Sequence, residues 1–328
     1  MRAQRRSRRD NRRGELRLIA ACFWVGTLIS ACSETASRTA DSSTATTALA
    51  DTLSGGWRLT WRDEFDGTSL DSSKWVAEQG NGFWNADSSA YVGGWGNEEL
   101  QCYTANAANV QLRDGALQIT ALRETVRDAS SRDPNATCHF TSARLKTRAQ
   151  DGRALFAQQY GRVVFRARLP EGQGLWPALW MLPLRDTYGT WAASGEIDIL
   201  EARGQNPHVV LGTLHYGGQW PGNVHTGMDY VLPDSGRISD WHEYAVEWTP
   251  GRITWSVDDS TYQTQTQWYS GIDSTQKAKG AAPFDQPFYL VMNLAVGGRF
   301  LGPPDSRTTF PGRLEVDWVR VYQRAREP

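Results

Sequence analysis

The sequence is short of several features that would assign it to a common class. Only four of its 328 residues are cysteine, which excludes a small disulfide-dense scaffold. No group of His and Cys residues has the spacing of metal ligands, so no zinc site is predicted. The apolar run Leu18–Ala31 is too short to span a bilayer as an ordinary helix. The formal net charge is −1, and nucleic acid is therefore not an expected partner.

Helical periodicity is also missing from the chain after residue 55, and no internal repeat is found. Instead, short alternating segments are separated by Gly, Pro, Asn and Asp. Residues 57–66 read as a first strand, and residues 109–122 read as a hairpin that turns at Arg113-Asp114-Gly115. This pattern predicts an all-β antiparallel sandwich of two sheets. We expect one large domain over residues 56–328, acting as a monomer.

The first residues have the layout of an export signal. Several arginines precede the apolar segment, which ends in Leu28–Cys32 (LISAC). This ending resembles the lipobox of bacterial lipoproteins, which predicts cleavage after residue 31 and a lipid anchor on Cys32. An ordinary signal peptide with an incidental cysteine is the alternative, and the product would then be periplasmic or secreted. Residues 32–55, rich in Ser, Thr and Ala, read as a flexible tether.

Removal of residues 1–31 changes both the charge and the cysteine count. The segment carries eight Arg and two acidic residues, a net charge of +6, so the remainder falls from −1 to −7. An acidic protein favours a neutral or cationic partner. With Cys32 used for lipid, Cys102 and Cys138 remain, and we expect them to form a disulfide in an oxidising cell envelope.

The chain is organised around three carboxylates in the segment Glu196–Glu201 (EIDILE). Strict alternation would place Glu196 and Asp198 on one face but turn Glu201 into the core, where an unpaired carboxylate is costly. A one-residue β-bulge restores Glu201 to the face of Asp198. Two glutamates on one face suit retaining glycoside hydrolysis, which needs a nucleophile and an acid/base. A solvated acidic edge strand is the simpler alternative, but Trp-rich segments on both sides argue against it.

The EIDILE segment resembles the E-x-D-x-x-E signature of glycoside hydrolase family 16, in the bulged form of its laminarinase, agarase and carrageenase branches. Other runs resemble the laminarinase type, and the resemblance covers nearly all of residues 57–323. They are Gly96–Thr104 (GNEELQCYT), Thr141–Leu145 (TSARL), Gly174–Pro183 (GLWPALWMLP), Gly212–Gly217 (GTLHYG), Trp241–Pro250 (WHEYAVEWTP), Asn293–Gly298 (NLAVGG) and Val316–Tyr322 (VDWVRVY). The resemblance implies a β-jelly roll of two curved sheets with a concave substrate cleft.

The resemblance also implies roles that the residues alone leave open. Glu196 would be the nucleophile and Glu201 the acid/base, with Asp198 tuning the nucleophile. Aromatic platforms and polar side chains would bind sugar, because sugars combine apolar C–H faces with hydroxyl groups. The candidates are Trp176, Trp180, Asn97, Arg144 and His215, with His215 expected beside Glu201, and more weakly Trp95, Trp191 and Trp220, any of which could instead be packing residues.

No cofactor is expected for the chemistry, but members of the family often hold a structural calcium ion. By resemblance, Glu64, the Gly115 carbonyl and Asp317 would be its ligands.

The function expected from these features is an endo-acting β-1,3-glucanase anchored at the envelope, with β-glucan polysaccharide as its partner and the membrane contacted only through the lipid. Mixed-linkage glucan, agarose or carrageenan could replace β-1,3-glucan on the same fold. A non-catalytic β-glucan-binding module is a third interpretation, although such modules have lost the glutamates that are present here.

Overall fold

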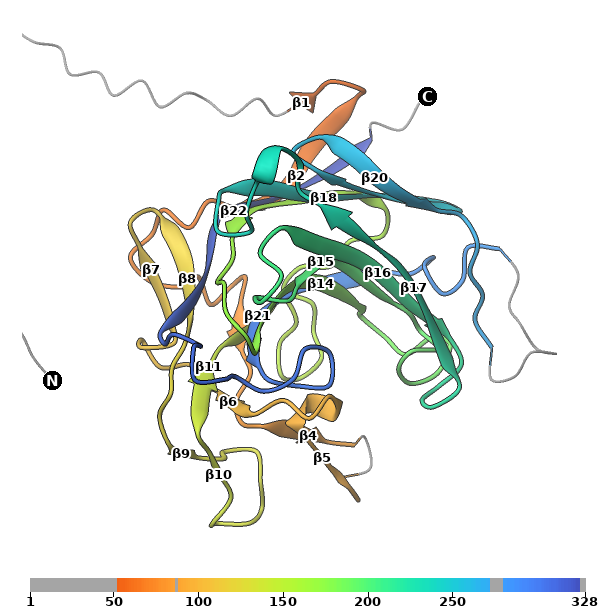
Figure 1. Cartoon of the computed structure of the whole chain (residues 1–328). Helices are drawn as coiled ribbons and strands as arrows, with labels where there is room; N and C mark the ends of the chain where they lie inside the picture. The colour runs from red at the N-terminus through yellow and green to blue at the C-terminus, as the bar shows by residue number, and fades with distance from the viewer. Residues whose placement is uncertain (1–51, 86–87, 272–279, 325–328) are drawn as a thin grey trace, which may run out of the picture. The chain divides into compact units, whose positions relative to one another are not determined.

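A computed structural model describes residues 52–85, 88–271 and 280–324 (Figure 1). The signal segment, Cys32 and nearly all of the tether lie outside the described residues, so these predictions are not tested. No helix among the described residues has the length and apolarity needed to cross a membrane.

The described chain is built from short strands and two single-turn 3₁₀ helices. The strands are β1 (Thr52–Leu53), β2 (Trp57–Asp63), β3 (Val76–Ala77), β4 (Gly82–Trp84), β5 (Tyr91–Gly93), β6 (Gln101–Tyr103), β7 (Val110–Arg113), β8 (Ala116–Ala121), β9 (Val126–Arg127), β10 (Thr137–Cys138), β11 (Phe140–Ser142), β12 (Arg144–Lys146), β13 (Gly161–Arg168), β14 (Leu175–Pro183), β15 (Glu196–Ala202), β16 (Val209–Gly217), β17 (Asn223–Val231), β18 (His242–Thr249), β19 (Arg252–Val257), β20 (Ser260–Gln265), β21 (Phe288–Val296) and β22 (Gly312–Arg324). The 3₁₀ helices are η1 (Gly94–Gly96) and η2 (Pro233–Ser235).

Two large antiparallel sheets form the domain. One has the order β17-β16-β15-β14-β21-β12-β3, and we call it the catalytic sheet because it carries EIDILE on β15. The other, the outer sheet, has the order β1-β2-β22-β13-β18-β19-β20, with β8 also pairing with β22 and β7 with β8. The all-β antiparallel prediction is confirmed.

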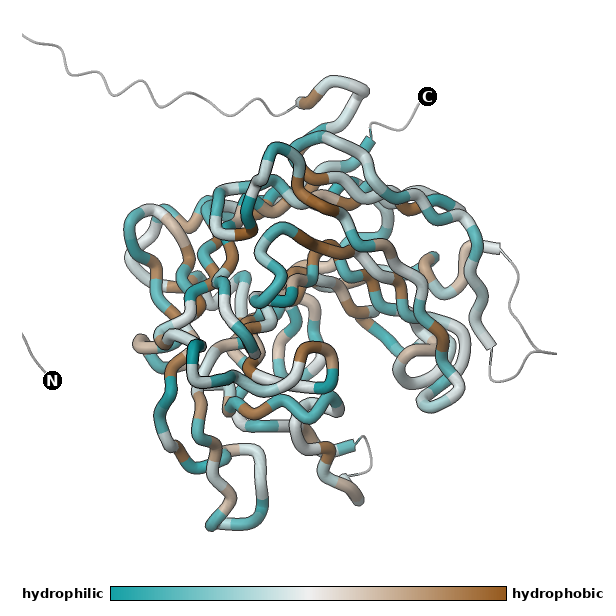
Figure 2. Tube along the Cα trace, in the orientation of Figure 1, coloured by the Kyte–Doolittle hydropathy of each residue, from teal (hydrophilic) through white to brown (hydrophobic). Residues whose placement is uncertain are grey.

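The core lies between the two sheets and follows the alternation of the strands. On β13 and β18 of the outer sheet, Phe165 and Trp248 are buried, and on β14 and β21 of the catalytic sheet Leu179 and Met292 are buried. Figure 2 shows apolar stretches along the strands of both sheets. Because successive side chains on a strand point to opposite faces, the residues that alternate with these apolar ones lie on the face of the catalytic sheet opposite the core. We call this the carboxylate face.

The structure adjusts some predicted boundaries and confirms others. The first strand predicted over residues 57–66 ends at Asp63, and Thr52–Leu53, assigned to the tether, pairs with it as β1. The hairpin over residues 109–122 is present as β7 and β8, and its turn at Asp114 and Gly115 has positive φ angles of 55° and 76°. Such angles suit a two-residue hairpin turn and favour glycine.

One short ladder departs from the antiparallel arrangement. β6 and β11 pair in parallel, with Cys102 opposite Thr141. Cys102 and Cys138 form a disulfide with a Cα–Cα distance of 5.6 Å. The disulfide joins β6 to β10, so that the Gly96–Thr104 run is covalently tied to the segment before β11.

Candidate active site

The EIDILE segment on β15 contains the β-bulge that the sequence predicts. On β14, Trp180 pairs with Asp198 and Leu179 with Leu200, so Ile199 is the extra residue. On the other side, Ile199 and Leu200 lie opposite a single residue of β16. Ile199 and Leu200 are both buried. The bulge thus returns Glu201 to the carboxylate face while both apolar side chains remain in the core.

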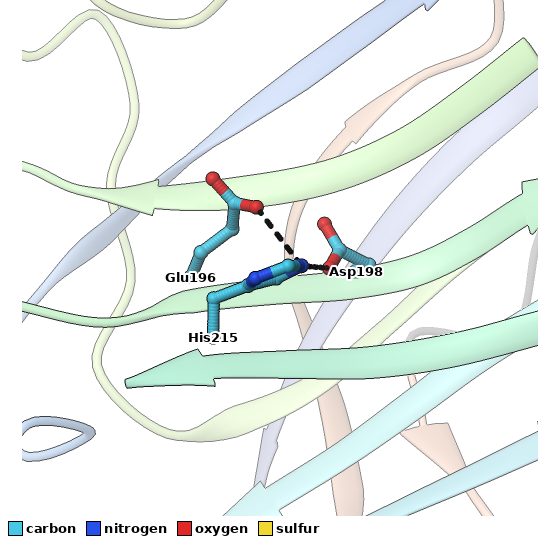
Figure 3. Close-up of side chains that lie close together, drawn as sticks. All are labelled: Glu196, Asp198 and His215. Atoms are coloured by element: carbon cyan, nitrogen blue, oxygen red, sulfur yellow. Dashed lines mark ion pairs between the residues drawn. The ribbon is translucent and has the colours of Figure 1, made fainter. Parts of the chain in front are cut away.

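His215 lies across from the first carboxylate of this strand. It pairs with Glu196 in the β15–β16 ladder, and its Nε2 lies 3.6 Å from Glu196 Oε1 and 3.4 Å from Asp198 Oδ2. Figure 3 shows the imidazole lying between the two carboxylates. The sequence prediction placed His215 beside Glu201. The structure corrects this, because the register of β16 sets His215 opposite the start of β15.

Each glutamate receives a hydrogen bond from a different tryptophan. Trp191 Nε1 donates to Glu196 Oε2 at 2.9 Å, and Trp176 Nε1 donates to Glu201 Oε1 at 3.0 Å. Because an indole N–H can only donate, one oxygen of each carboxyl group must act as the acceptor, and this fixes the orientation of the group. The two tryptophans are therefore partners of the reacting groups as well as aromatic surfaces.

Burial and charge separate the two glutamates electrostatically. Burial, and then the charge of Asp198, raise the pKa of Glu196 to about 7, and the same two causes raise the pKa of Glu201 to about 8. The charge of Glu196 raises the pKa of Glu201 further. Of the two glutamates, Glu196 lies closer to His215, whose charge lowers its pKa. The positive charge of His215 beside Glu196 favours an ionised Glu196, and the raised pKa of Glu201 favours a protonated carboxyl group near neutral pH, which are the states of a nucleophile and an acid.

His215 carries a positive charge at neutral pH. Burial alone would lower the pKa of its imidazole, but Asp198, Glu196 and Glu201 together raise it to about 10. The imidazolium compensates part of the negative charge that three nearby carboxyl groups would otherwise accumulate.

A second cluster on the carboxylate face surrounds Arg144. Its guanidinium lies between Trp95 and Trp180, at 4.6 and 4.7 Å from the ring centroids. Its Nε pairs with Glu78 Oε2 at 2.7 Å. Two aromatic rings and one carboxylate thus hold Arg144, which suits a rigid polar contact for sugar hydroxyls.

The remaining sugar-binding candidates lie at different parts of this face. Asn97 is exposed and donates to Glu99 Oε1 at 3.3 Å. Trp191 is 39% exposed, and its ring lies 5.6 Å from that of His215 and 6.3 Å from that of Trp220, which is 65% exposed. Trp95 packs against Arg144 as described. None of these tryptophans belongs to the core between the two sheets, although Trp95 also packs against Phe83 and Tyr103.

Two of the three predicted calcium ligands, Glu64 and Asp317, are engaged by arginines. Arg320 Nε and Nη2 bind Glu64 Oε1 and Oε2 at 2.9 and 2.7 Å, and Arg166 pairs with Asp317. A calcium ion at this place would have to displace both guanidinium groups from these carboxylates. Calcium binding stays a prediction from the resemblance.

A different set has the donor spacing of a metal site. Among the described residues, one ligand atom each of Glu196, Asp198 and His215 lies within 4.8 Å of the others. A cation there would need His215 to lose its proton and would occupy the oxygen of Glu196. The three residues are better suited to setting each other's protonation states than to binding a metal.

The sequence of the domain matches a family model along most of its length. The model of Glycosyl hydrolases family 16 covers residues 96–320. The chain belongs to glycoside hydrolase family 16.

Relatives in this family resemble the chain in sequence and fold. Glucan endo-1,3-beta-glucosidase A1 of Niallia circulans is 46% identical over 272 residues, covering 82% of this chain and 38% of that protein's length. Glucan endo-1,3-beta-glucosidase of Cryptopygus antarcticus is 40% identical, covering 82% of this chain and 93% of that protein. The X-ray structure of endo-beta-1,3-glucanase from Pyrococcus furiosus superposes with a TM-score of 0.68 at 35% identity, covering 82% of this chain and 95% of that one.

Several site residues escaped the sequence analysis. Glu99, Tyr103 and Asn293 are buried near Arg144 and Trp180, and the ring of Phe300 lies 4.9 Å from that of Trp176 in a tilted arrangement. The first three lie inside the family-like runs Gly96–Thr104 and Asn293–Gly298. The signal in the first run is that Glu99, Gln101 and Tyr103 stand at alternate positions, which places their polar groups on one face of a strand.

Proposed function

We propose that this family 16 enzyme is a retaining endo-glycosidase that hydrolyses internal β-1,3-glucosidic linkages of laminarin-like glucans. The observation that carries the proposal is the bulged β15, with Glu196 and Glu201 on one face and with pKa values raised to about 7 and about 8. His215 lies beside Glu196, the residue that must attack as an anion, and the raised pKa of Glu201 suits the residue that must donate a proton.

The mechanism has two steps on these carboxyl groups. Ionised Glu196 attacks the anomeric carbon, the glycosidic C–O bond breaks, and Glu201 gives its proton to the departing oxygen. Glu201, now a carboxylate, then removes a proton from water, whose oxygen attacks the glycosyl-enzyme and releases Glu196. Asp198 and His215 lie beside Glu196 in both steps, and their opposite charges set the stability of its ionised form. Protein carboxyl groups supply all of this chemistry, and no cofactor is needed.

The preference for β-1,3-glucan rests on similarity. Both relatives above are named as glucan endo-1,3-beta-glucosidases, and the Gly96–Thr104 and Gly174–Pro183 runs are of the laminarinase type. The net charge of −7 after loss of residues 1–31 does not favour a sulfated galactan as substrate.

Product analysis on laminarin, curdlan, lichenan and agarose, run side by side, tests the proposal. We expect internal cleavage of laminarin with the β anomer released first. Glu196→Gln serves as the inactive control, since it preserves the shape of the side chain. Cleavage of agarose without cleavage of laminarin would overturn the substrate assignment, and release of the α anomer would overturn the retaining mechanism. Binding without cleavage by the wild type would indicate a glucan-recognition module.

We further propose that the enzyme is exported and held at the bacterial envelope as a monomeric lipoprotein. Support comes from Leu28–Cys32 and from the Cys102–Cys138 disulfide, which suits an oxidising compartment. Cys32→Ala should abolish lipidation and move the protein out of the membrane fraction. An unchanged fractionation would show that Cys32 does not anchor the chain.

A further inference from the structure

Glu99 is a buried carboxylate that the two-step mechanism does not use. It lies between η1 and β6 with 7% of its surface exposed. Three side chains donate to it: Gln101 Nε2 to Oε2 at 2.7 Å, Tyr103 Oη to Oε2 at 3.1 Å and Asn97 Nδ2 to Oε1 at 3.3 Å. A buried carboxyl group is costly unless hydrogen bonds satisfy it, and these three donors do so.

The donors around Glu99 make both of its oxygens acceptors. The pKa of Glu99 is raised, because burial outweighs the hydrogen bond from Gln101 and the charge of Arg144. Gln101 is itself locked, since its Oε1 accepts from Val296 N at 2.7 Å, so its amide must present Nε2 to Glu99.

Tyr103 links Glu99 to Trp180 through the side chain of Asn293. Tyr103 Oη donates to Glu99 Oε2 at 3.1 Å. The Tyr103 oxygen then accepts from Asn293 Nδ2 at 3.1 Å. This orients the Asn293 amide so that its Oδ1 accepts from Trp180 Nε1 at 2.7 Å. Because the indole N–H of Trp180 can only donate, the three hydrogen bonds run in one direction, with Trp180 as the first donor and Glu99 as the last acceptor.

We propose that Glu99 is a positioning residue for the substrate. Its carboxyl group orients Trp180 through Tyr103 and Asn293, and it orients the Asn97 amide directly, so that one buried acceptor positions two residues of the sugar-binding surface. The proposal rests on the proposed function only in that Trp180 and Asn97 contact the sugar chain. We call the path through Tyr103 and Asn293 the Trp180 arm and the Glu99–Asn97 hydrogen bond the Asn97 arm. Neither arm reaches Glu196 or Glu201, so the network should affect substrate binding more than bond cleavage.

A double-mutant cycle on the full-length protein tests the Trp180 arm. Tyr103→Phe removes the hydroxyl and leaves Asn293 Nδ2 unpaired, so we expect KM to rise about 10-fold with kcat changed less than about 3-fold. Trp180→Phe keeps an aromatic ring but removes the indole N–H. In that background Tyr103→Phe should add little further loss, because the chain no longer has an end to orient.

Glu99→Gln tests the Asn97 arm. One side-chain oxygen cannot accept from Asn97 and from the Gln101–Tyr103 pair together, so KM should rise while kcat is retained. Part of this effect should persist in the Trp180→Phe background, because Asn97 is held independently of Trp180.

Tyr244→Phe is the matched control for Tyr103→Phe. Tyr244 is equally buried at 1% exposure, lies on β18 of the outer sheet, and its hydroxyl has no hydrogen-bond partner. We expect its KM to equal that of the wild type. Thermal unfolding of every variant verifies folding.

Additive effects of Tyr103→Phe and Trp180→Phe on KM would overturn the proposal, as would an unchanged KM in Tyr103→Phe or a loss confined to kcat. The cycle is run on whichever polysaccharide of the four the wild type cleaves best. A substrate other than laminarin would refute the proposed specificity without affecting the cycle.

Discussion

Trp191, with 39% of its surface exposed, donates a hydrogen bond from Nε1 to Glu196 Oε2 at 2.9 Å. Glu196, the proposed nucleophile, therefore has a hydrogen-bond partner at the surface, in the segment just before β15. Glu201, the proposed acid/base, instead accepts from Trp176 on the neighbouring strand β14. Two tryptophans from different parts of the chain thus act on the two carboxyl groups separately, and this separation makes the roles of the site testable.

Trp191→Phe should move one limb of the pH profile. The indole N–H favours the ionised form of Glu196 and lowers its pKa. Its loss raises that pKa above about 7, so the acidic limb of kcat/KM moves to higher pH, while the basic limb set by Glu201 stays in place. We expect an activity loss of roughly 10-fold near pH 6, the order for a hydrogen bond to a charged group. Trp318→Phe on the outer sheet is the control, and an unmoved acidic limb would show that this bond does not tune the nucleophile.

His215→Gln should move both limbs. The imidazolium lowers the pKa of Glu196 and of Glu201, so replacing it with a neutral side chain raises both. The whole bell-shaped profile of kcat/KM then shifts to higher pH. The same assay as for Trp191→Phe checks this, and a shift confined to the acidic limb would place the charge of His215 on Glu196 alone.

Azide rescue distinguishes the two glutamates. Glu201→Ala loses leaving-group protonation, a factor on the order of 10²–10⁴ on polysaccharide, but an aryl glycoside with an acidic phenol should still form the glycosyl-enzyme. Azide then attacks without a general base and gives a β-glycosyl azide. Glu196→Ala should instead give the α-azide, because no covalent intermediate forms. An α-azide from Glu201→Ala would reverse the assigned roles.

Removal of the disulfide should lower stability substantially. Cys102 and Cys138 close a loop with a sequence separation of 36 residues, worth about 4 kcal/mol in the chain-entropy model. The double variant Cys102→Ala/Cys138→Ala should lose free energy of unfolding of that order in a denaturant titration. Mass analysis after alkylation of the denatured, unreduced wild type should find neither of these two thiols free. Labelling of both would rule out the bond.

Calcium should have little effect on unfolding if the arginine pairs persist in solution. Because Arg320 and Arg166 already engage Glu64 and Asp317, we expect the same Tm with added calcium and after treatment with a chelator. Glu64→Gln should lower Tm, since the side chain of Arg320 is only 16% exposed and would lose its partner. A Tm that rises with calcium concentration would instead support the ligand set implied by the resemblance.

The sequence by itself determined the placement of the three carboxylates. Alternation sets Glu196 and Asp198 on one face, and the cost of burying Glu201 predicts the bulge that Ile199 forms. These are local effects of strand period and solvation, which neighbouring residues encode. The family-like runs likewise identified Trp176, Trp180 and Arg144 as residues of this face.

Only the tertiary structure decided which side chains meet across strands. The β15–β16 register puts His215 opposite Glu196 rather than beside Glu201. Arg320 reaches Glu64 from a position 256 residues away in the sequence. Tyr103 and Asn293 meet from 190 residues apart. Strand pairing over such separations depends on how the whole sheet packs, because a shift of one residue would turn every side chain to the other face.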